Sequence, residues 1–182
     1  MNNVHHNFIV ANYAADGGCL DNDDGSSYYE IHHNFCVFGG HKSDFDGNRK
    51  VSSYNIHAYP SVYGTTCLAI LAQNLPPQGF GEGYHHNKCI LPKSGSPYLK
   101  IGGLEGAACL TAASRVQFEA GLAVANNTIY APGALVTITC GKANVNLTDF
   151  QGMGYDQGTT ITSEVPTAAT IIQWAEELLK QD

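Results

Sequence analysis

The chain of 182 residues is 43% hydrophobic and 14% charged, and its formal net charge at pH 7 is −7. This length fits one domain with a sizeable core, and the negative charge without a basic stripe argues against a nucleic-acid partner. No run approaches the roughly 20 apolar residues of a membrane span. The first residues also lack the basic and apolar segments of a signal peptide.

A short motif recurs from the beginning of the chain. Residues 4–10, with the sequence Val-His-His-Asn-Phe-Ile-Val, return in similar form at 31–37 and 84–90. Short intervals between strand-forming copies, of the length of one coil, are typical of a parallel β-solenoid, and longer intervals indicate inserted loops. The repeated asparagines, including looser copies, are Asn7, Asn34, Asn55, Asn87 and Asn127.

Each repeated asparagine is predicted to occupy a sharp corner between two strands. Asparagine tolerates the left-handed conformation that such a corner requires, and its amide can bond to the same amide one coil away. We therefore expect an internal asparagine ladder, with the paired histidines stacked along the coils. A metal site at these pairs is not assigned, because neighbours along a strand point to opposite faces.

The six cysteines contain no Cys-x-x-Cys pair, which argues against a zinc ribbon or a thioredoxin-like site. Cys36 and Cys89 follow the repeated asparagine by two positions, so we expect them in the core. Small buried thiols are favoured over disulfides, although an even number of cysteines is compatible with disulfides in a secreted protein. The sequons at Asn126 and Asn146 are also compatible with secretion.

Aspartates are concentrated in one short part of the chain, which contains Asp21, Asp23, Asp24, Asp44 and Asp46. Crowded carboxylates repel one another, so holding them together costs stability unless a function or a cation offsets it. The spacing between Asp23 and Asp46 corresponds to roughly one coil. Stacked coils would place these carboxylates ~5 Å apart, near the separation found in retaining glycosidases. One carboxylate would act as nucleophile and the other as general acid.

Other side chains near these acids are candidate sites of sugar contact. They are Asp21, Asp44, His41, Lys42 and Tyr28, with Asp24 as a second candidate nucleophile. Two alternatives remain for the acidic stretch: a solvated turn, since Asp, Asn, Gly and Ser dominate turns, and a calcium site. An EF-hand is excluded because Gly25 falls at the fifth position of the loop counted from Asp21. No other cofactor and no metal ligand is assigned.

The last segment has a different pattern. From Pro166 to Leu179, apolar residues recur on one face, which predicts an amphipathic helix. We expect this helix to cap an open end of the solenoid, which would otherwise expose unpaired backbone. The predicted organisation is a parallel β-helix over residues 1–165 and a helix over 166–182 packed on the same domain. Because the repeat is already running at Asn3, we expect the chain to be the C-terminal part of a longer solenoid.

The segment from Leu20 to Ile31, with Asn34 and the turn Gly39–Lys42, resembles the right-handed parallel β-helix proteins of the pectin-lyase-like superfamily. It is most similar to β-helical glycoside hydrolases of the β-xylosidase and α-fucosidase types, which carry a similar Asp-Asp-Gly-Ser-Ser turn ahead of a Gly-Gly-x-Lys turn. The resemblance covers Asn3 to Ile101. It implies an all-β, right-handed, single-stranded parallel β-helix with a catalytic acid on each of two successive coils.

By position, the resemblance implies Asp23 or Asp24 as nucleophile and Asp46 as acid/base, where the relatives have a longer Glu. The expected function is an extracellular or cell-surface glycoside hydrolase acting on a poly- or oligosaccharide. One alternative is a polysaccharide lyase or epimerase, calcium-dependent in some cases, with Lys42, Arg49 or His41 as the base. Another is a β-helix that binds glycans without catalysis. The sequence assigns neither a sugar nor an oligomeric state.

Overall fold

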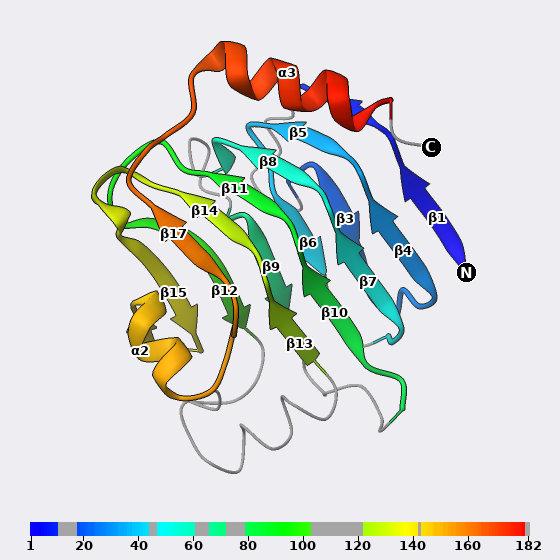
Figure 1. Cartoon of the computed structure of the whole chain (residues 1–182). Coiled ribbons are helices and arrows are strands. Elements are labelled where there is room, and N and C mark those ends of the chain that lie inside the picture. Colours follow the sequence, from blue (N-terminus) through cyan, green and yellow to red (C-terminus); the bar gives the residue numbers. More distant parts are fainter. Residues whose placement is uncertain are drawn as a thin grey trace.

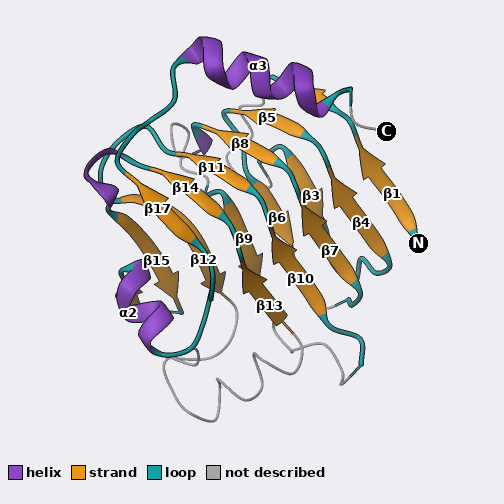
Figure 2. Ribbon diagram, viewed as in Figure 1, coloured by secondary structure: helices purple, strands orange, loops and turns teal. Residues whose placement is uncertain are grey.

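The computed structural model describes residues 1–10, 18–43, 47–60, 66–71, 79–102, 122–141 and 143–180. They are mostly short strands, with few helices, in three sheets that the chain visits in turn (Figures 1 and 2). The prediction of an all-β protein with parallel sheets is confirmed. Among the described helices, none is long and apolar enough to cross a membrane. We call one passage through the three sheets a coil.

Sheet A contains β1 (Asn2–His5), β4 (Tyr29–His32), β7 (Lys50–Ser53), β10 (Glu82–His85) and β13 (Leu122–Ala125). Sheet B contains β2 (Phe8–Ile9), β5 (Phe35–Val37), β8 (Ile56–Ala58), β11 (Lys88–Ile90), β14 (Thr128–Tyr130) and β17 (Thr160–Thr162). Sheet C contains β3 (Leu20–Asn22), β6 (His41–Ser43), β9 (Leu68–Leu71), β12 (Ser96–Gly102), β15 (Val136–Cys140) and β16 (Ala143–Val145). Within the described strands, all pairings are parallel except that of β15 with β16.

The strands are short because each contributes only one or two side chains to the space between the sheets. Side chains alternate along a strand, so in the three-residue strands of sheet B the central residue faces inward. Those central residues are buried and in register from coil to coil: Cys36, His57, Cys89 and Ile129. The later coils have an apolar interior that includes Leu68, Ile101 and Val124.

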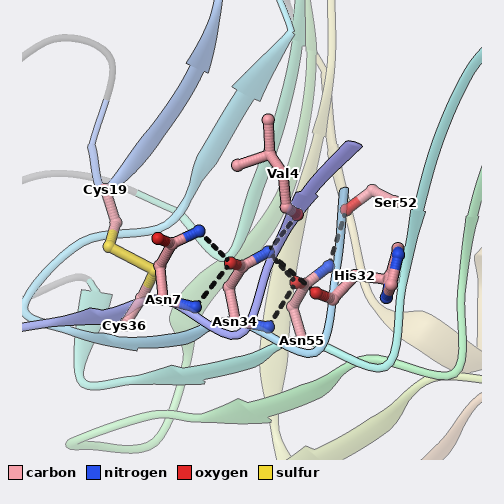
Figure 3. The surroundings of a disulfide bond; sticks show 8 residues. All are labelled: Val4, Asn7, Cys19, His32, Asn34, Cys36, Ser52 and Asn55. Carbon is pink, nitrogen blue, oxygen red and sulfur yellow. Dashed lines mark hydrogen bonds between the residues drawn. A yellow bond between two sulfur atoms is a disulfide. The ribbon is translucent and has the colours of Figure 1, made fainter. Parts of the chain in front are cut away.

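The predicted asparagine ladder is confirmed. The Nδ2 atom of Asn34 donates to Oδ1 of Asn55 at 2.9 Å, and Asn55 donates in the same way to Asn87 at 3.0 Å. The backbone N–H of each of these residues donates to the same oxygen of its neighbour, at 3.0 Å in both cases. The ladder begins at Asn7, and Figure 3 shows its first members, Asn7, Asn34 and Asn55. It continues through Asn127 to the hydroxyl of Thr159.

The corner geometry differs from the prediction in one respect. The left-handed residue is not the asparagine but the residue before it. These residues have φ between 53° and 58°, and they are His6, His33, Tyr54, His86 and Asn126. The asparagine amide is therefore free to point inward, where it satisfies backbone groups that the corner leaves without partners.

The prediction of buried free thiols is wrong. Cys19 and Cys36 form a disulfide (Figure 3). Cys67 and Cys89 form a second one, and Cys140 is also disulfide-bonded. Each of the two described bridges joins the residue before a sheet C strand to the central residue of a sheet B strand in the next coil. The bridges therefore tie consecutive coils together covalently and constrain the unfolded chain.

The C-terminal helix, α3 (Ala168–Leu178), is present as predicted, but it does not cap an end of the stack. Its buried residues Ile171, Ala175 and Leu178 pack against the outward side chains of sheet B, including Phe35 and Ile90. Figure 1 shows α3 lying across β5, β8 and β11. The outer face of sheet B carries apolar side chains in these coils, so it needs this cover. Thr167 is the N-cap, and Pro166 precedes it.

The last coil is covered instead by the short helix α2 (Leu147–Gly152), which follows β16. Leu147 and Phe150 of α2 join the apolar interior of the later coils. The helix begins here because the Asn146 side chain accepts from the N–H of Asp149 at 2.8 Å and so acts as its N-cap. A single 3-10 turn, η3 (Pro132–Ala134), connects β14 to β15.

We predict that Asn55→Ala destabilises the fold strongly. Asn55 is fully buried, and its removal leaves two N–H donors of Asn34 without their acceptor. Each unsatisfied buried group costs about 1–3 kcal/mol, so we expect a loss of about 3 kcal/mol or more in the free energy of unfolding measured in urea. The exposed Asn7→Ala is the matched control and should cost under about 1.5 kcal/mol. Equal losses in the two variants would contradict this role of the ladder.

Candidate functional site

Residues 23–28 of the acidic stretch form the turn between β3 and β4, at the edge where sheet C leads to sheet A. We call this segment the acidic turn. The N–H of Ser26 donates to the carbonyl of Asp23 at 3.0 Å, and Gly25 has a left-handed φ of 73°. This turn leaves the side chains of Asp23 and Asp24 exposed. Two of the predicted catalytic acids are therefore open to a ligand.

Strand pairing on both sides of this turn fixes the offset between its coil and the next. Asp21 pairs with Lys42 before the turn, and Tyr29 pairs with Lys50 after it, so the offset is the same on both sides. The same offset counted along the sequence from Asp23 ends at Asp44, whereas the predicted partner of Asp23 is Asp46. Asp44 and Asp46 lie outside the described residues.

The two coils approach closely beside the turn. A side chain on Gly47 would place its Cβ within about 2.1 Å of the Ser26 carbonyl oxygen, and Gly47 has a φ of 78°. The Ser27 hydroxyl accepts from the N–H of Asn48 at 3.0 Å. Only glycine fits position 47, because of this close approach and because of its left-handed φ. The acidic turn is therefore held directly against the coil that follows it.

Asp21 and Lys42 are register partners, and their charged groups lie 3.3 Å apart. The Asp21 side chain is partly exposed. A surface pair of this kind adds little stability, but it presents a carboxylate and an ammonium beside the turn. The structure thus brings two of the predicted sugar contacts together.

Tyr28, another predicted contact, belongs to a row that sequence reasoning missed. The Arg49 guanidinium lies over the Tyr28 ring at 5.7 Å and over the Phe80 ring at 4.6 Å. Tyr28 and Phe80 are 45% and 37% exposed, which is unusual for large aromatic side chains. The row lies on the same edge as the acidic turn, because Tyr28 ends that turn and donates its N–H to Asn48. Sequence offered only a weak signal, an aromatic or cationic residue shortly before three of the strands of sheet A.

The prediction that His41 contacts substrate is wrong. His41 faces inward and is only 2% exposed. Its Nε2 lies 2.9 Å from Oδ1 of Asn22, and its Nδ1 lies 2.9 Å from the Ser52 hydroxyl. Burial lowers the pKa of His41 to about 3, so the ring is neutral near pH 7. Instead of touching a ligand, His41 links Asn22, which lies between Asp21 and Asp23, to the interior of the stack.

The interior also contains buried polar side chains, which lie on strands of the second to fourth coils beside apolar residues such as Leu20 and Ile31. Lys50 and Glu82 form a buried ion pair at 3.1 Å, and the Tyr84 hydroxyl donates to Glu82 at 3.2 Å. Burial raises the pKa of Glu82, although Lys50 opposes the shift. His57 is fully buried, and burial lowers its pKa to about 4. The sequence contains one signal of this cluster: Lys50 and Glu82 are charged residues at strand positions that, by the alternation of side chains, face inward.

The first two histidine pairs stack from coil to coil as predicted, but the expectation that the two rings of one pair point to opposite faces is wrong. His5 stacks on His32 at 5.1 Å and His6 on His33 at 5.4 Å. Because the second histidine is left-handed, the two rings of a pair lie on the same side, with their Nδ1 atoms 2.7 Å apart in His5–His6. Within the described residues, no group of three or more His, Cys, Asp or Glu side chains is placed to hold a metal ion.

A groove runs between this stacked row and α3. It is lined by His33, Tyr54, Ile56, His86, Lys88, Trp174, Glu177 and Leu178. Its aromatic faces are already covered, since Tyr54 stacks between His33 and His86 and the Lys88 ammonium lies 4.3 Å from the centre of the Trp174 ring. The groove therefore offers little ring surface to a sugar.

No protein-family model, curated protein or solved structure matches this chain. The edge that carries the acidic turn, Lys42 and the Tyr28–Arg49–Phe80 row combines exposed carboxylates, cations and aromatic rings, all three of which suit a polar ligand with apolar faces.

We predict that replacing His41 changes the pH dependence of stability. The folded-state pKa of about 3 lies below the unfolded value of about 6.5, so the unfolded chain alone takes up this proton as the pH falls below 6.5. The contribution of neutral His41 to the free energy of unfolding is therefore fully present above pH 6.5. It is lost as the pH falls toward 3, at up to about 1.4 kcal/mol per pH unit.

In His41→Gln, which keeps an amide near Asn22 and Ser52, the free energy of unfolding should fall less steeply between pH 6.5 and 4.5. Urea titrations at several pH values measure the difference. Asp156, whose pKa burial raises to about 6, acts in the opposite direction but is common to both proteins. Identical slopes in the two proteins would contradict the burial of a neutral His41.

Proposed function

We propose that this chain belongs to a right-handed parallel β-helix protein of the pectin-lyase-like type that binds and hydrolyses a poly- or oligosaccharide. The observation that carries the proposal is the edge where exposed Asp23 and Asp24 lie beside the partly exposed Tyr28–Arg49–Phe80 row. Aromatic rings stack on the apolar faces of pyranoses, and charged groups bond to their hydroxyls.

The proposed chemistry needs a second acid one coil away from Asp23. Neighbouring coils are separated by about 4.8 Å, close to the ~5–5.5 Å between the carboxyls of retaining glycosidases. Asp23 would attack the anomeric carbon while the second acid protonates the leaving oxygen, and that residue would then deprotonate the water that releases the sugar. The coil offset favours Asp44 for this role, and the resemblance favours Asp46. Asp24 is the second candidate nucleophile.

The disulfides support an extracellular or cell-surface location. The structure has the disulfides Cys19–Cys36 and Cys67–Cys89. Disulfide bonds persist in oxidising compartments and are rare in the reducing cytosol. Polymeric carbohydrate is abundant outside cells, so location and proposed substrate agree.

A lyase is less well supported than a hydrolase. A lyase needs a basic side chain that can remove a proton beside a uronate carboxylate. His41 is buried away from the surface, and the Lys42 ammonium is paired with Asp21. Arg49 stays protonated at neutral pH, which makes it a poor base.

We predict that Asp23→Asn abolishes hydrolysis of aryl glycosides, with kcat/KM falling by about 10³-fold or more. Asp44→Asn and Asp46→Asn, compared side by side, identify the second acid as the one whose loss is of similar size. The matched control is Glu176→Gln, an exposed carboxylate on α3 that should leave kcat/KM unchanged.

Each alternative has its own outcome in this assay. If uronate polymers are converted to unsaturated products, and only when calcium is present, the protein is a lyase and not a hydrolase. Glycan binding without turnover, reduced by Tyr28→Ala, would replace it with a binding protein. Undiminished hydrolysis in all three Asp variants would refute the assignment of the catalytic residues.

A further inference from the structure

Three corners of the stack present two imidazoles side by side, and the function proposed above does not use them. They are His5–His6, His32–His33 and His85–His86, and in each the left-handed second residue turns its ring toward that of the first. The distances between the paired Nδ1 atoms are 2.7, 2.9 and 2.9 Å. The two ring planes are nearly perpendicular in every pair.

These distances fit adjacent ligands of a square-planar metal ion. With metal–nitrogen bonds of about 2.0 Å, two nitrogens at a right angle lie about 2.8 Å apart, whereas a tetrahedral ion such as zinc separates them by about 3.3 Å. Square-planar or tetragonal coordination by nitrogen is typical of copper(II) and nickel(II). The backbone fixes the spacing, because the asparagine ladder holds each corner in the same conformation.

The corners are accessible and lie in a favourable field. The side chains of His5 and His86 are exposed, and those of His32 and His33 are partly exposed. Glu30 acts electrostatically on His32, and its carboxylate would attract a cation to that corner. The chain as a whole carries a net charge of −7.

We propose that the His–His corners chelate a divalent cation of the copper(II) or nickel(II) class, with water completing the coordination. In the metal-free state, a hydrogen bond between the two Nδ1 atoms holds each pair together. A cation would replace that hydrogen bond with two bonds to nitrogen. The donor ring moves its proton from Nδ1 to Nε2, so that each neutral ring supplies the Nδ1 lone pair to the cation.

The spacing of the corners sets the number of ions. His5–His6 lies directly on His32–His33, with rings 5.1 and 5.4 Å apart, so two cations there would repel each other. The row is then interrupted by Ser53–Tyr54 before His85–His86. We therefore expect two ions per chain: one bound at either the first or the second corner, and one at the third.

The chain itself supplies the control substitutions. At the fifth corner the paired positions are Ala125 and Asn126, and Asn126 has the same left-handed φ of 55°. Replacing a His–His pair by Ala–Asn thus keeps the backbone and removes both ligands. His85→Ala/His86→Asn alters only the third corner, and His5→Ala/His6→Asn/His32→Ala/His33→Asn removes the first two.

The test is a copper(II) titration of the tag-free chain at pH 7.4, followed by calorimetry and by electron paramagnetic resonance. The expected result is two ions, each coupled to two nitrogen nuclei. Each of the two variants should lose one ion, and differences between variants cancel any binding by the free N-terminal amine. Circular dichroism checks that the variants remain folded.

The same number of ions in the variants, or coupling to a single nitrogen per ion, would overturn the proposal. If the fourfold variant does not fold, the third corner decides alone, because His85→Ala/His86→Asn changes one corner only. Glycoside hydrolysis by that variant, measured without metal, should be unchanged. The metal proposal and the hydrolase proposal can therefore fail independently of each other.

Discussion

The hydrogen bonds between the amides of successive asparagines determine how the other parts of this structure are arranged. Each inward amide accepts two N–H groups from one neighbouring coil and donates to backbone or side-chain oxygens of others, as Asn55 does with Asn34, Asn87 and the carbonyl of Ile31. A corner buried between stacked coils would otherwise leave these groups without partners, at a cost of about 1–3 kcal/mol for each. The ladder therefore fixes the same corner in every coil, whatever the length of the loops inserted between coils.

That fixed corner decides what the outside of the stack presents. The residue before each ladder asparagine is left-handed, so its side chain joins that of its predecessor on one face. There the chain has placed imidazole and phenol rings that stack at 5.1 to 5.4 Å from coil to coil. The edge between sheets C and A is built differently, from glycine turns and hydrogen bonds such as that from Asn48 to Ser27. It carries the exposed acids and the Tyr28–Arg49–Phe80 row, so two edges of the same stack carry two separate sets of polar groups.

The interior also changes along the stack. In the second to fourth coils it holds neutral His41 and His57 and the Lys50–Glu82 ion pair, beside apolar clusters that lie in both the earlier and the later coils. Buried charges and imidazoles stabilise less than apolar packing of the same volume. One member of this polar part, His41, bonds to Asn22, the last residue of β3 before the acidic turn. The two disulfides join consecutive coils, and the first of them packs in the apolar cluster with Leu20 and Ile31.

The sequence alone was sufficient to predict the parallel strands, the ladder of Asn7 to Asn127, the stacked histidines and the amphipathic helix, because each of these depends on a local pattern repeated at intervals. It was insufficient wherever distant segments had to be placed against one another. Cysteine spacing does not reveal that Cys19 reaches Cys36, and the apolar face of α3 does not say whether it covers an end or the outer face of sheet B. A histidine beside aspartates does not reveal that it points inward, as His41 does. The offset between coils at the acidic turn comes from pairing between strands. Only the tertiary structure decides it, because the register of two strands depends on every hydrogen bond and side-chain contact between them.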